Sequence, residues 1–113
     1  MTFLVNGSWV ELGALLTPEQ VIALIEDTVL PSLEMFARWE QEGRIKGGVF
    51  PGERETTFVL EAASAEEVGE LLASLPFWGM MKWHVRPLQS MRSTITREKG
   101  TVDRLKSRVS GNG

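Results

Sequence analysis

The sequence has no cysteine and no tyrosine, and its 113 residues include a single histidine. Without cysteine the chain has no disulfide, no thiolate nucleophile and no thiolate ligand for a metal, so its stability must come from packing and assembly. One histidine among scattered acidic residues also lacks the ligand spacing of a zinc site. We therefore expect no metal centre and no cofactor, and the composition fits a reducing compartment.

Long apolar runs are also missing. The segment Met1–Trp9 has no basic region, and Asn6, Gly7 and Ser8 interrupt it before an apolar stretch develops. This predicts a cytoplasmic protein with no membrane partner. A net charge of −3 argues against a nucleic-acid partner, because duplex binding needs a positive face. With 42% hydrophobic residues, the chain can build one domain around one modest core.

Charge is distributed unevenly along the chain. Acidic residues dominate before Met81, whereas the remainder is basic. The basic residues of this second part are Lys82, Arg86, Arg92, Arg97, Lys99, Arg104, Lys106 and Arg108. We interpret the end of the chain as a solvated or subunit-bridging segment, with contact to RNA or to an acidic partner as the alternative.

Local patterns predict the first strand and the first helix. Alternation over Thr2–Val10 is typical of a strand. The hydroxyl of Thr17, the following proline and Gln20 form a capping-box pattern that begins a helix, whose apolar stripe continues to Trp39. Pro31 should bend or break this helix near Val29 and Leu30, because it lacks an amide donor. Gly43 is a suitable residue to follow its last turn.

The next segments predict a hairpin, a second helix and a last strand. Residues 44–50 and 56–62 flank the turn Pro51–Gly52, Ser64 and Glu67 repeat the capping-box pattern, and residues 82–86 alternate again. The order is the βαββαβ pattern of a ferredoxin-like α+β fold, a four-stranded antiparallel sheet with two helices on one face. We predict this domain over residues 1–89.

The predicted sheet carries apolar residues on both faces, whichever side the helices cover. Phe58 and Leu60 point to one face, and Thr57 and Val59 point to the other. An uncovered apolar face is normally buried by a partner. We therefore predict sheet-to-sheet pairing into a dimeric α/β barrel, a homodimer or a higher homo-oligomer that encloses a ligand-sized cavity.

The last strand carries the candidate catalytic residues. Lys82, His84 and Arg86 share one face, while Trp83 and Val85 point to the other. On the cavity side the three would form a cationic patch for a carboxylate or an enolate, with His84 moving a proton and Lys82 or Arg86 stabilising charge. The alternative is a hydrogen-bonded interface histidine beside two solvated cations.

Glutamates of the hairpin are a second set of candidates. Glu53, Glu55 and Glu61 lie on or beside it, and Glu55 and Glu61 share one face. A cavity-facing carboxylate is a candidate base, and the alternative is an exposed edge charge that discourages aggregation. The glycine pair Gly47–Gly48 indicates a bulge or a close approach to the backbone.

Large apolar residues supply the candidate ligand-binding wall. Phe77, Trp78 and Met80 lie in an apolar turn beside a glycine, and Phe58 lies on the hairpin strand. Such a cluster suits a pocket wall or a subunit contact for a small hydrophobic or carboxylated ligand, with plain core packing as the alternative.

The segment Leu71–Leu88 resembles the muconolactone isomerase family, in which a leucine-rich helix ends in Leu-Pro, an apolar turn follows and a final strand ends near Pro-Leu. Ser64–Glu67 and the hairpin strand from Gly52 to Glu61 are similar to the same layout. The resemblance implies a plait that dimerises sheet to sheet, with ligand sites in the barrel or between sheet and helices. It also implies proton transfer within an unsaturated lactone, without a metal or cofactor.

Residues 90–113 extend beyond this resemblance. Val102, Leu105 and Val109 recur at helical spacing after Thr101. We predict a basic C-terminal extension that forms a short helix or turn and packs on a neighbouring subunit.

Three functions remain open from the sequence. The first is an isomerase or cyclase that moves a proton in a conjugated or lactone-type ring. The second is a noncatalytic dimer that binds a small molecule, and the third is an accessory subunit whose extension recruits another protein.

Overall fold

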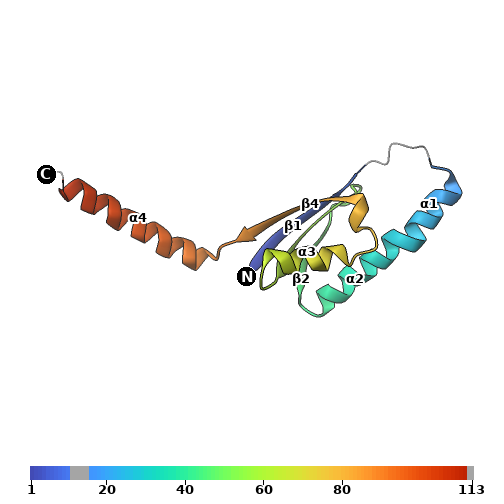
Figure 1. The fold of residues 1–113 in the computed structure, drawn as a ribbon, viewed down its shortest axis with the longest axis horizontal. Coiled ribbons are helices and arrows are strands. Elements are labelled where there is room, and N and C mark those ends of the chain that lie inside the picture. Colours follow the sequence, from blue (N-terminus) through green and yellow to red (C-terminus); the bar gives the residue numbers. More distant parts are fainter. Residues whose placement is uncertain (11–15, 112–113) are drawn as a thin grey trace.

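A computed structural model describes residues 1–10 and 16–111 of the chain (Figure 1). Strands and helices follow one another in the predicted order. The elements are β1 (Thr2–Trp9), α1 (Pro18–Leu24), the π-helical segment η1 (Ile25–Val29), α2 (Leu30–Gln41), β2 (Ile45–Val49), β3 (Glu55–Glu61), α3 (Ala65–Ala73), the 3-10 segment η2 (Trp78–Met80), β4 (Met81–Leu88) and α4 (Met91–Gly111).

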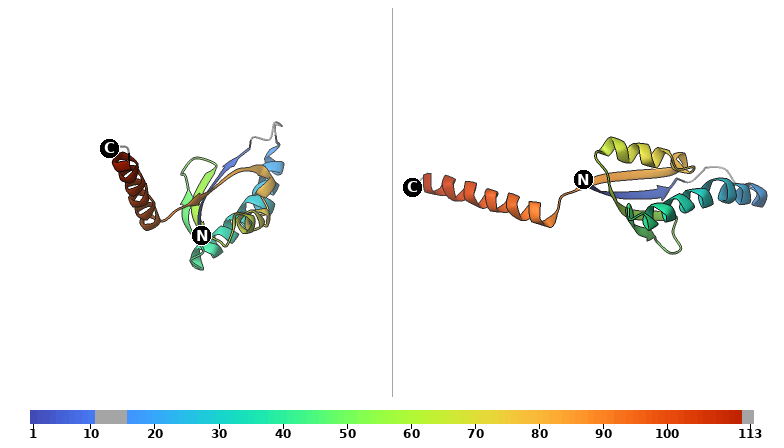
Figure 2. Two further views of the ribbon diagram at one scale, coloured as in Figure 1. Left: turned by 60° about the vertical axis from the view of Figure 1, so that its left-hand side comes forward. Right: turned by 90° about the horizontal axis from the view of Figure 1, so that it is seen from below.

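The four strands form one antiparallel sheet in the order β2-β3-β1-β4. Helices α2 and α3 lie on the same side of it, as the left view of Figure 2 shows. This order and these connections are those of the ferredoxin-like α+β fold. The predicted fold class is confirmed.

The hydrophobic core lies between the sheet and these two helices. In the register of β1 and β3, Phe3 lies opposite Leu60 and Val5 opposite Phe58, so all four side chains point to the helices. Helix α2 adds Phe36 and Trp39 to this core. Helix α3 adds two aliphatic side chains, Val68 and Leu72.

Predicted signals mark the helix ends. The Thr17 hydroxyl accepts from the Gln20 amide at 3.2 Å and the Gln20 side chain accepts from the Thr17 amide at 2.9 Å, which completes the capping box. Gly43 follows α2 at φ +74°, a value that glycine adopts without strain. At α3 the Ser64 hydroxyl accepts from the Glu67 amide, but the Glu67 carboxylate accepts from the amide of Ala63.

Pro31 alters the helix in the predicted place. The turn before it is π-helical, and the Leu30 amide donates to the Ile25 carbonyl, five residues back. Pro31 has no amide hydrogen to continue the α-helical ladder, and the wider turn accommodates its ring. The chain therefore continues as α2 instead of breaking, and Ile25 and Val29 lie on the widened turn.

The face of the sheet opposite the helices, called the open face below, corrects one expectation. It carries mostly polar side chains, with Leu4 and Val59 as apolar exceptions near its centre and Leu88 at its end. The polar members are Thr2, Asn6, Ser8, Lys46, Glu55, Thr57, Glu61, Lys82, His84 and Arg86. The expected second apolar face is wrong, because the register directs most of the large apolar side chains of β1 and β3 to the helices. Apolarity of this face therefore gives no support to the predicted sheet-to-sheet dimer.

Helix α4 projects from the end of β4 and lies beside no other helix in Figures 1 and 2. Its 21 residues form a longer helix than predicted, and none of them is buried. Among the described residues, no helix combines the length and apolar character needed to cross a membrane.

Candidate functional site

An apolar cleft of about 320 Å³ opens between the sheet and the continuous helical segment α1–η1–α2. We call it the cleft. Its helical wall consists of Ile25, Val29, Leu30, Leu33 and Phe36, and its other lining residues are Trp9, Val49, Glu53, Arg54, Glu55, Thr56, Phe77 and Met81. The π-helical turn at Pro31 thus forms part of the wall, so the helix irregularity shapes this cleft.

Charged groups gather where the hairpin between β2 and β3 meets the cleft. The Arg54 guanidinium lies over the Trp9 ring, 5.2 Å from its centroid, which is within cation–π distance. The Trp9 amide donates to the Arg54 carbonyl at 3.0 Å, so backbone and side chain hold the two residues together. Glu53 precedes Arg54 in this turn, and its amide donates to the Phe50 carbonyl at 3.1 Å. A carboxylate and a guanidinium therefore lie beside an apolar wall.

Ser32 joins the helical wall to the turn that contains Phe77. Its hydroxyl donates to the Thr28 carbonyl at 2.8 Å and accepts from the Phe77 amide at 3.0 Å. Ser32 is fully buried and Phe77 is nearly so. Both polar groups are satisfied, and the Phe77 ring is held against Phe36 and Trp83.

A second hollow of about 200 Å³ continues from the cleft along the edge of the sheet, between α2 and β2. We call it the edge groove. It shares Leu33, Phe36, Val49 and Thr56 with the cleft. Gly47 lies in it, and a Cβ there would overlap the backbone of Thr57 and Phe58, so the expected close approach at the glycine pair occurs within the sheet itself.

The three predicted catalytic residues lie together on the open face. Lys82, His84 and Arg86 are exposed, while Trp83 and Val85 pack towards the core, as the alternation predicts. His84 and Arg86 line a depression of about 290 Å³ with Leu4, Asn6 and Thr57. This depression is smaller and less apolar in its lining than the cleft.

Asn6 organises the polar groups of this face. It pairs with Thr57 on one side and His84 on the other in the sheet register. Its amide nitrogen donates to the Thr57 hydroxyl at 2.7 Å and to the Glu55 carboxylate at 3.1 Å. The Glu55 carboxylate is therefore bonded on the open face although the residue also borders the cleft, whereas Glu53 lines the cleft alone. Glu61 is exposed at the far end of β3, where it accepts from the Thr2 hydroxyl and lies 3.6 Å from the N-terminal amine.

The predicted ligand-binding residues are divided among three environments. Phe77 lines the cleft, and Phe58 is buried in the core beside Phe36, where it also lines the edge groove. Met80 packs against the core. Trp78 is 49% exposed, and its carbonyl accepts from the Trp83 indole at 3.2 Å.

The sheet therefore separates the predicted catalytic residues from the predicted ligand-binding residue Phe77 within one chain. His84 points to the open face and Phe77 to the helix side, so one small ligand on this chain does not touch both. No group of three or more potential metal ligands occurs within residues 1–10 and 16–111.

Sequence reasoning missed Trp9, Arg54 and Ser32 as parts of the site. Arg54 and Trp9 are far apart in the chain and meet only through the end of the β1–β3 pairing. Ser32 lies within the helix stripe, where a serine resembles an ordinary surface residue. The proline immediately before it was the available signal, because a bent helix leaves backbone groups that side chains must satisfy.

Comparison with known proteins adds the family. The comparison with curated proteins finds no match. Among protein families, the family model of muconolactone delta-isomerase matches residues 1–94, which include the whole sheet, both packed helices and the cleft. The chain therefore belongs to the muconolactone delta-isomerase family.

Proposed function

We propose that the protein is an isomerase that binds a small unsaturated lactone in the cleft and transfers a proton within it without a cofactor. The observation that carries this proposal is the cleft itself, whose apolar walls and volume of about 320 Å³ suit a small conjugated ring. Family membership supports the reaction class. Muconolactone, named in the family description, is the first substrate to test.

The charged groups at the cleft provide the chemistry. The Glu53 carboxylate takes a proton from a ring carbon next to the conjugated system, and the Arg54 guanidinium binds the ligand's carboxylate or the developing enolate oxygen. Glu53 then returns the proton to another carbon of the same ring. The double bond moves, and Glu53 is again a carboxylate ready for the next turnover. Phe77 and Met81 exclude water from the ring, and exclusion of water strengthens these electrostatic interactions.

The open face is the competing location for the same reaction. There His84 would move the proton, with Lys82 or Arg86 as the stabilising cation, in the depression that also contains Asn6. We favour the cleft because its lining is far more apolar and offers a larger wall to a ring. A noncatalytic dimer that binds a small molecule is the remaining alternative.

Steady-state turnover of muconolactone by purified variants tests these roles. We expect Glu53→Gln to lower kcat by about 10²-fold or more, in line with the usual contribution of a general base. Arg54→Gln should raise KM, and His84→Gln should leave both constants within a factor of two. Glu42→Gln removes an exposed carboxylate outside the cleft and serves as the matched control.

The outcomes separate the alternatives. Loss of turnover in His84→Gln with an active Glu53→Gln would place the reaction on the open face and contradict the cleft proposal. Binding of muconolactone without turnover by the unaltered protein would support the noncatalytic module instead.

We also propose that the protein acts in the cytoplasm, and its cysteine-free composition supports a reducing compartment.

A further inference from the structure

Helix α4 carries an apolar stripe that nothing in the chain covers. Ile95, Val102, Leu105 and Val109 recur at intervals of seven, three and four residues, which places them on one side of the helix. They are 47–74% exposed. A solvated helix of 21 residues with a glycine at its centre is marginal by propensity alone, so this stripe indicates a docked helix.

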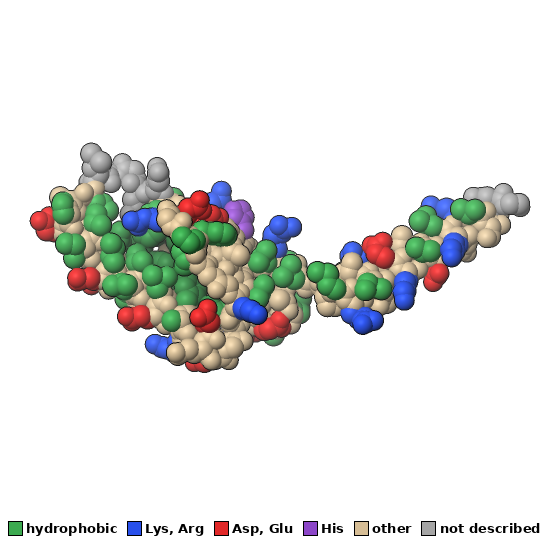
Figure 3. Space-filling model, turned by 180° about the vertical axis from the view of Figure 1, so that it is seen from behind, with side chains coloured by type: hydrophobic (Ala, Val, Ile, Leu, Met, Phe, Trp, Pro, Cys, Tyr) green, Lys and Arg blue, Asp and Glu red, His purple; other side chains and the backbone are tan. Residues whose placement is uncertain are grey.

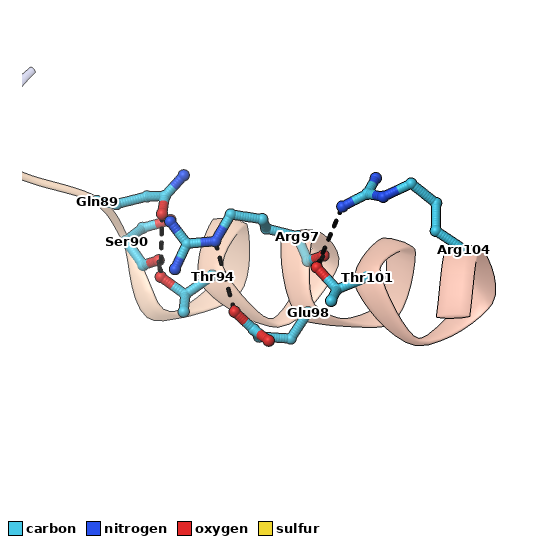
Figure 4. A network of polar contacts seen from close by, with 7 residues as sticks. All are labelled: Gln89, Ser90, Thr94, Arg97, Glu98, Thr101 and Arg104. Atoms are coloured by element: carbon cyan, nitrogen blue, oxygen red, sulfur yellow. Dashed lines mark hydrogen bonds and ion pairs between the residues drawn. The ribbon is translucent and has the colours of Figure 1, made fainter. Parts of the chain in front are cut away.

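The charge of α4 is opposite to that of the remaining chain. Residues 91–111 carry six Lys or Arg and two Asp or Glu, whereas residues 1–90 carry six and thirteen. The polar contacts within α4 are local. Figure 4 shows Arg97 beside Glu98 at 3.6 Å and Arg104 donating to the Thr101 hydroxyl at 3.2 Å. Lys99 and Lys106 flank the apolar stripe and are exposed, so the docking surface is apolar at its centre and basic at one border.

A matching surface exists on the domain, around the cleft and the edge groove. Four large apolar residues there are 37–53% exposed, namely Leu30, Leu33, Val49 and Phe50. The acidic residues Glu40, Glu53 and Glu55 line the two hollows, with Arg54 as the one cation among the lining residues. Figure 3 shows the hydrophobic side chains gathered around the hollow with acidic side chains at the margin.

The lengths of the two surfaces agree. The stripe from Ile95 to Val109 spans about 21 Å at 1.5 Å per residue. The helical wall from Ile25 to Ala37 spans about 18 Å by the same rise. One α4 is therefore long enough to cover the exposed apolar border.

The chain's own groove is out of reach for α4. The groove lies at the β2 edge of the sheet, and α4 follows β4 at the opposite edge, three strand spacings or about 14 Å away. Gln89 and Ser90 alone join β4 to α4, and two extended residues span about 7 Å. In addition, β4 runs away from the cleft, from Met81 at the cleft to Leu88 at the far end.

Pairing of two α4 helices is disfavoured by charge. Both helices carry a net charge of about +4 from the residues counted above. Glu98 also interrupts the apolar stripe between Ile95 and Val102, so parallel helices in register would bring two carboxylates together. The acidic groove removes the first objection, because its charge is opposite to the net charge of α4.

We propose that α4 of one copy docks into the edge groove and over the cleft border of a second copy, with its apolar stripe against Leu33 and Val49 and its lysines beside Glu40 and Glu53. The extension at residues 90–113 is then the element that joins copies of this chain. This interface rests on the exposed surfaces and their charges. It shares Glu53 and the cleft border with the proposed reaction, and the crosslinking test below reads the contact between copies without measuring turnover.

Thiol crosslinking of the full chain tests the interface, and the absence of native cysteine keeps the background low. Val49→Cys and Leu105→Cys replace exposed residues, so both variants should fold, which circular dichroism verifies. The two variants are mixed and treated with a short bismaleimide. We expect a covalent dimer at several-fold higher yield than in a mixture of Val49→Cys with Ser107→Cys, a control on the opposite side of α4.

Charge reversal adds a second readout. Adding Lys106→Glu to the Leu105→Cys chain should lower the yield several-fold, while Arg104→Glu, an equal charge change away from the stripe, should leave it unchanged. Equal yields with Leu105→Cys and Ser107→Cys would overturn the proposal. So would efficient crosslinking of Leu105→Cys to itself, which would show α4–α4 pairing, or an intramolecular crosslink in the double variant, which would show docking on the same chain.

Discussion

At the scale of single residues, two small residues, Ser32 and Gly7, determine how the aromatic cluster packs beside the cleft. The Ser32 hydroxyl donates a hydrogen bond to the Thr28 carbonyl and accepts one from the Phe77 amide. Gly7 leaves room for the Trp83 ring, since a Cβ at this position would overlap it. Neither residue touches a ligand in our account, yet both determine where the cleft wall lies.

Ser32→Ala should destabilise the protein by about 1–3 kcal/mol, because it leaves the buried Phe77 amide without an acceptor. Urea denaturation followed by tryptophan fluorescence measures this change. Ser74→Ala removes an exposed hydroxyl that bonds only to a carbonyl three residues back, and should change stability by less than about 0.5 kcal/mol. Equal effects of the two substitutions would contradict the role of Ser32.

Gly7→Ala should also destabilise the fold, by about 1–3 kcal/mol, because the added methyl group displaces Trp83. Gly69→Ala is the control, since its Cβ meets nothing within 4 Å and the position is helical, where alanine is favoured. Thermal unfolding should show a lowered midpoint for the first variant and an unchanged or raised midpoint for the second. A neutral Gly7→Ala would show that Trp83 packs elsewhere.

Residue-level reasoning from the sequence succeeded where one element decides the outcome. Strand alternation alone predicts that Lys82, His84 and Arg86 share one face, and all three are exposed on the same face of the sheet. The environments of Trp78 and Met80 depend on how the turn before β4 packs, which no local pattern contains. The contact between Arg54 and Trp9 depends on pairing between distant strands for the same reason.

Among the elements, the helix starts and the position of the irregularity before Pro31 were predictable because their causes are local. The capping box at Thr17 and the missing amide of Pro31 act within one turn. The polarity of the open face was not predictable in this way. It depends on which alternate side chains of β1 and β3 the helices cover, and a shift of one residue exchanges the two faces.

Helix α4 should depend on protein concentration for its stability. It has no buried residue within its own chain, so its backbone hydrogen bonds open easily unless a second copy covers it. Hydrogen exchange with mass spectrometry should show faster exchange in α4 peptides as the protein is diluted, while β1 peptides stay protected. Equal protection of α4 at all concentrations would contradict a stabilising contact between copies.

At the scale of the whole molecule, the sheet divides the chain into two chemically different sides. The helix side offers an apolar cleft with Glu53 and Arg54, and the open face offers polar groups around Asn6 and His84. Topology and family were predictable from the order of patterns and from the Leu71–Leu88 segment. The separation of the predicted catalytic and ligand-binding residues was not, because it requires the register of all four strands.

Binding of the ligand in the cleft can be followed by reporter residues on both sides of the sheet. Met81 lines the cleft, Met91 lies on α4 and His84 is the single histidine. The most direct measurement is a muconolactone titration followed by NMR of methyl-labelled methionines and of the His84 imidazole. We expect a saturable shift of the Met81 methyl signal with little change at the His84 imidazole. A saturable shift of His84 with an unchanged Met81 would contradict it.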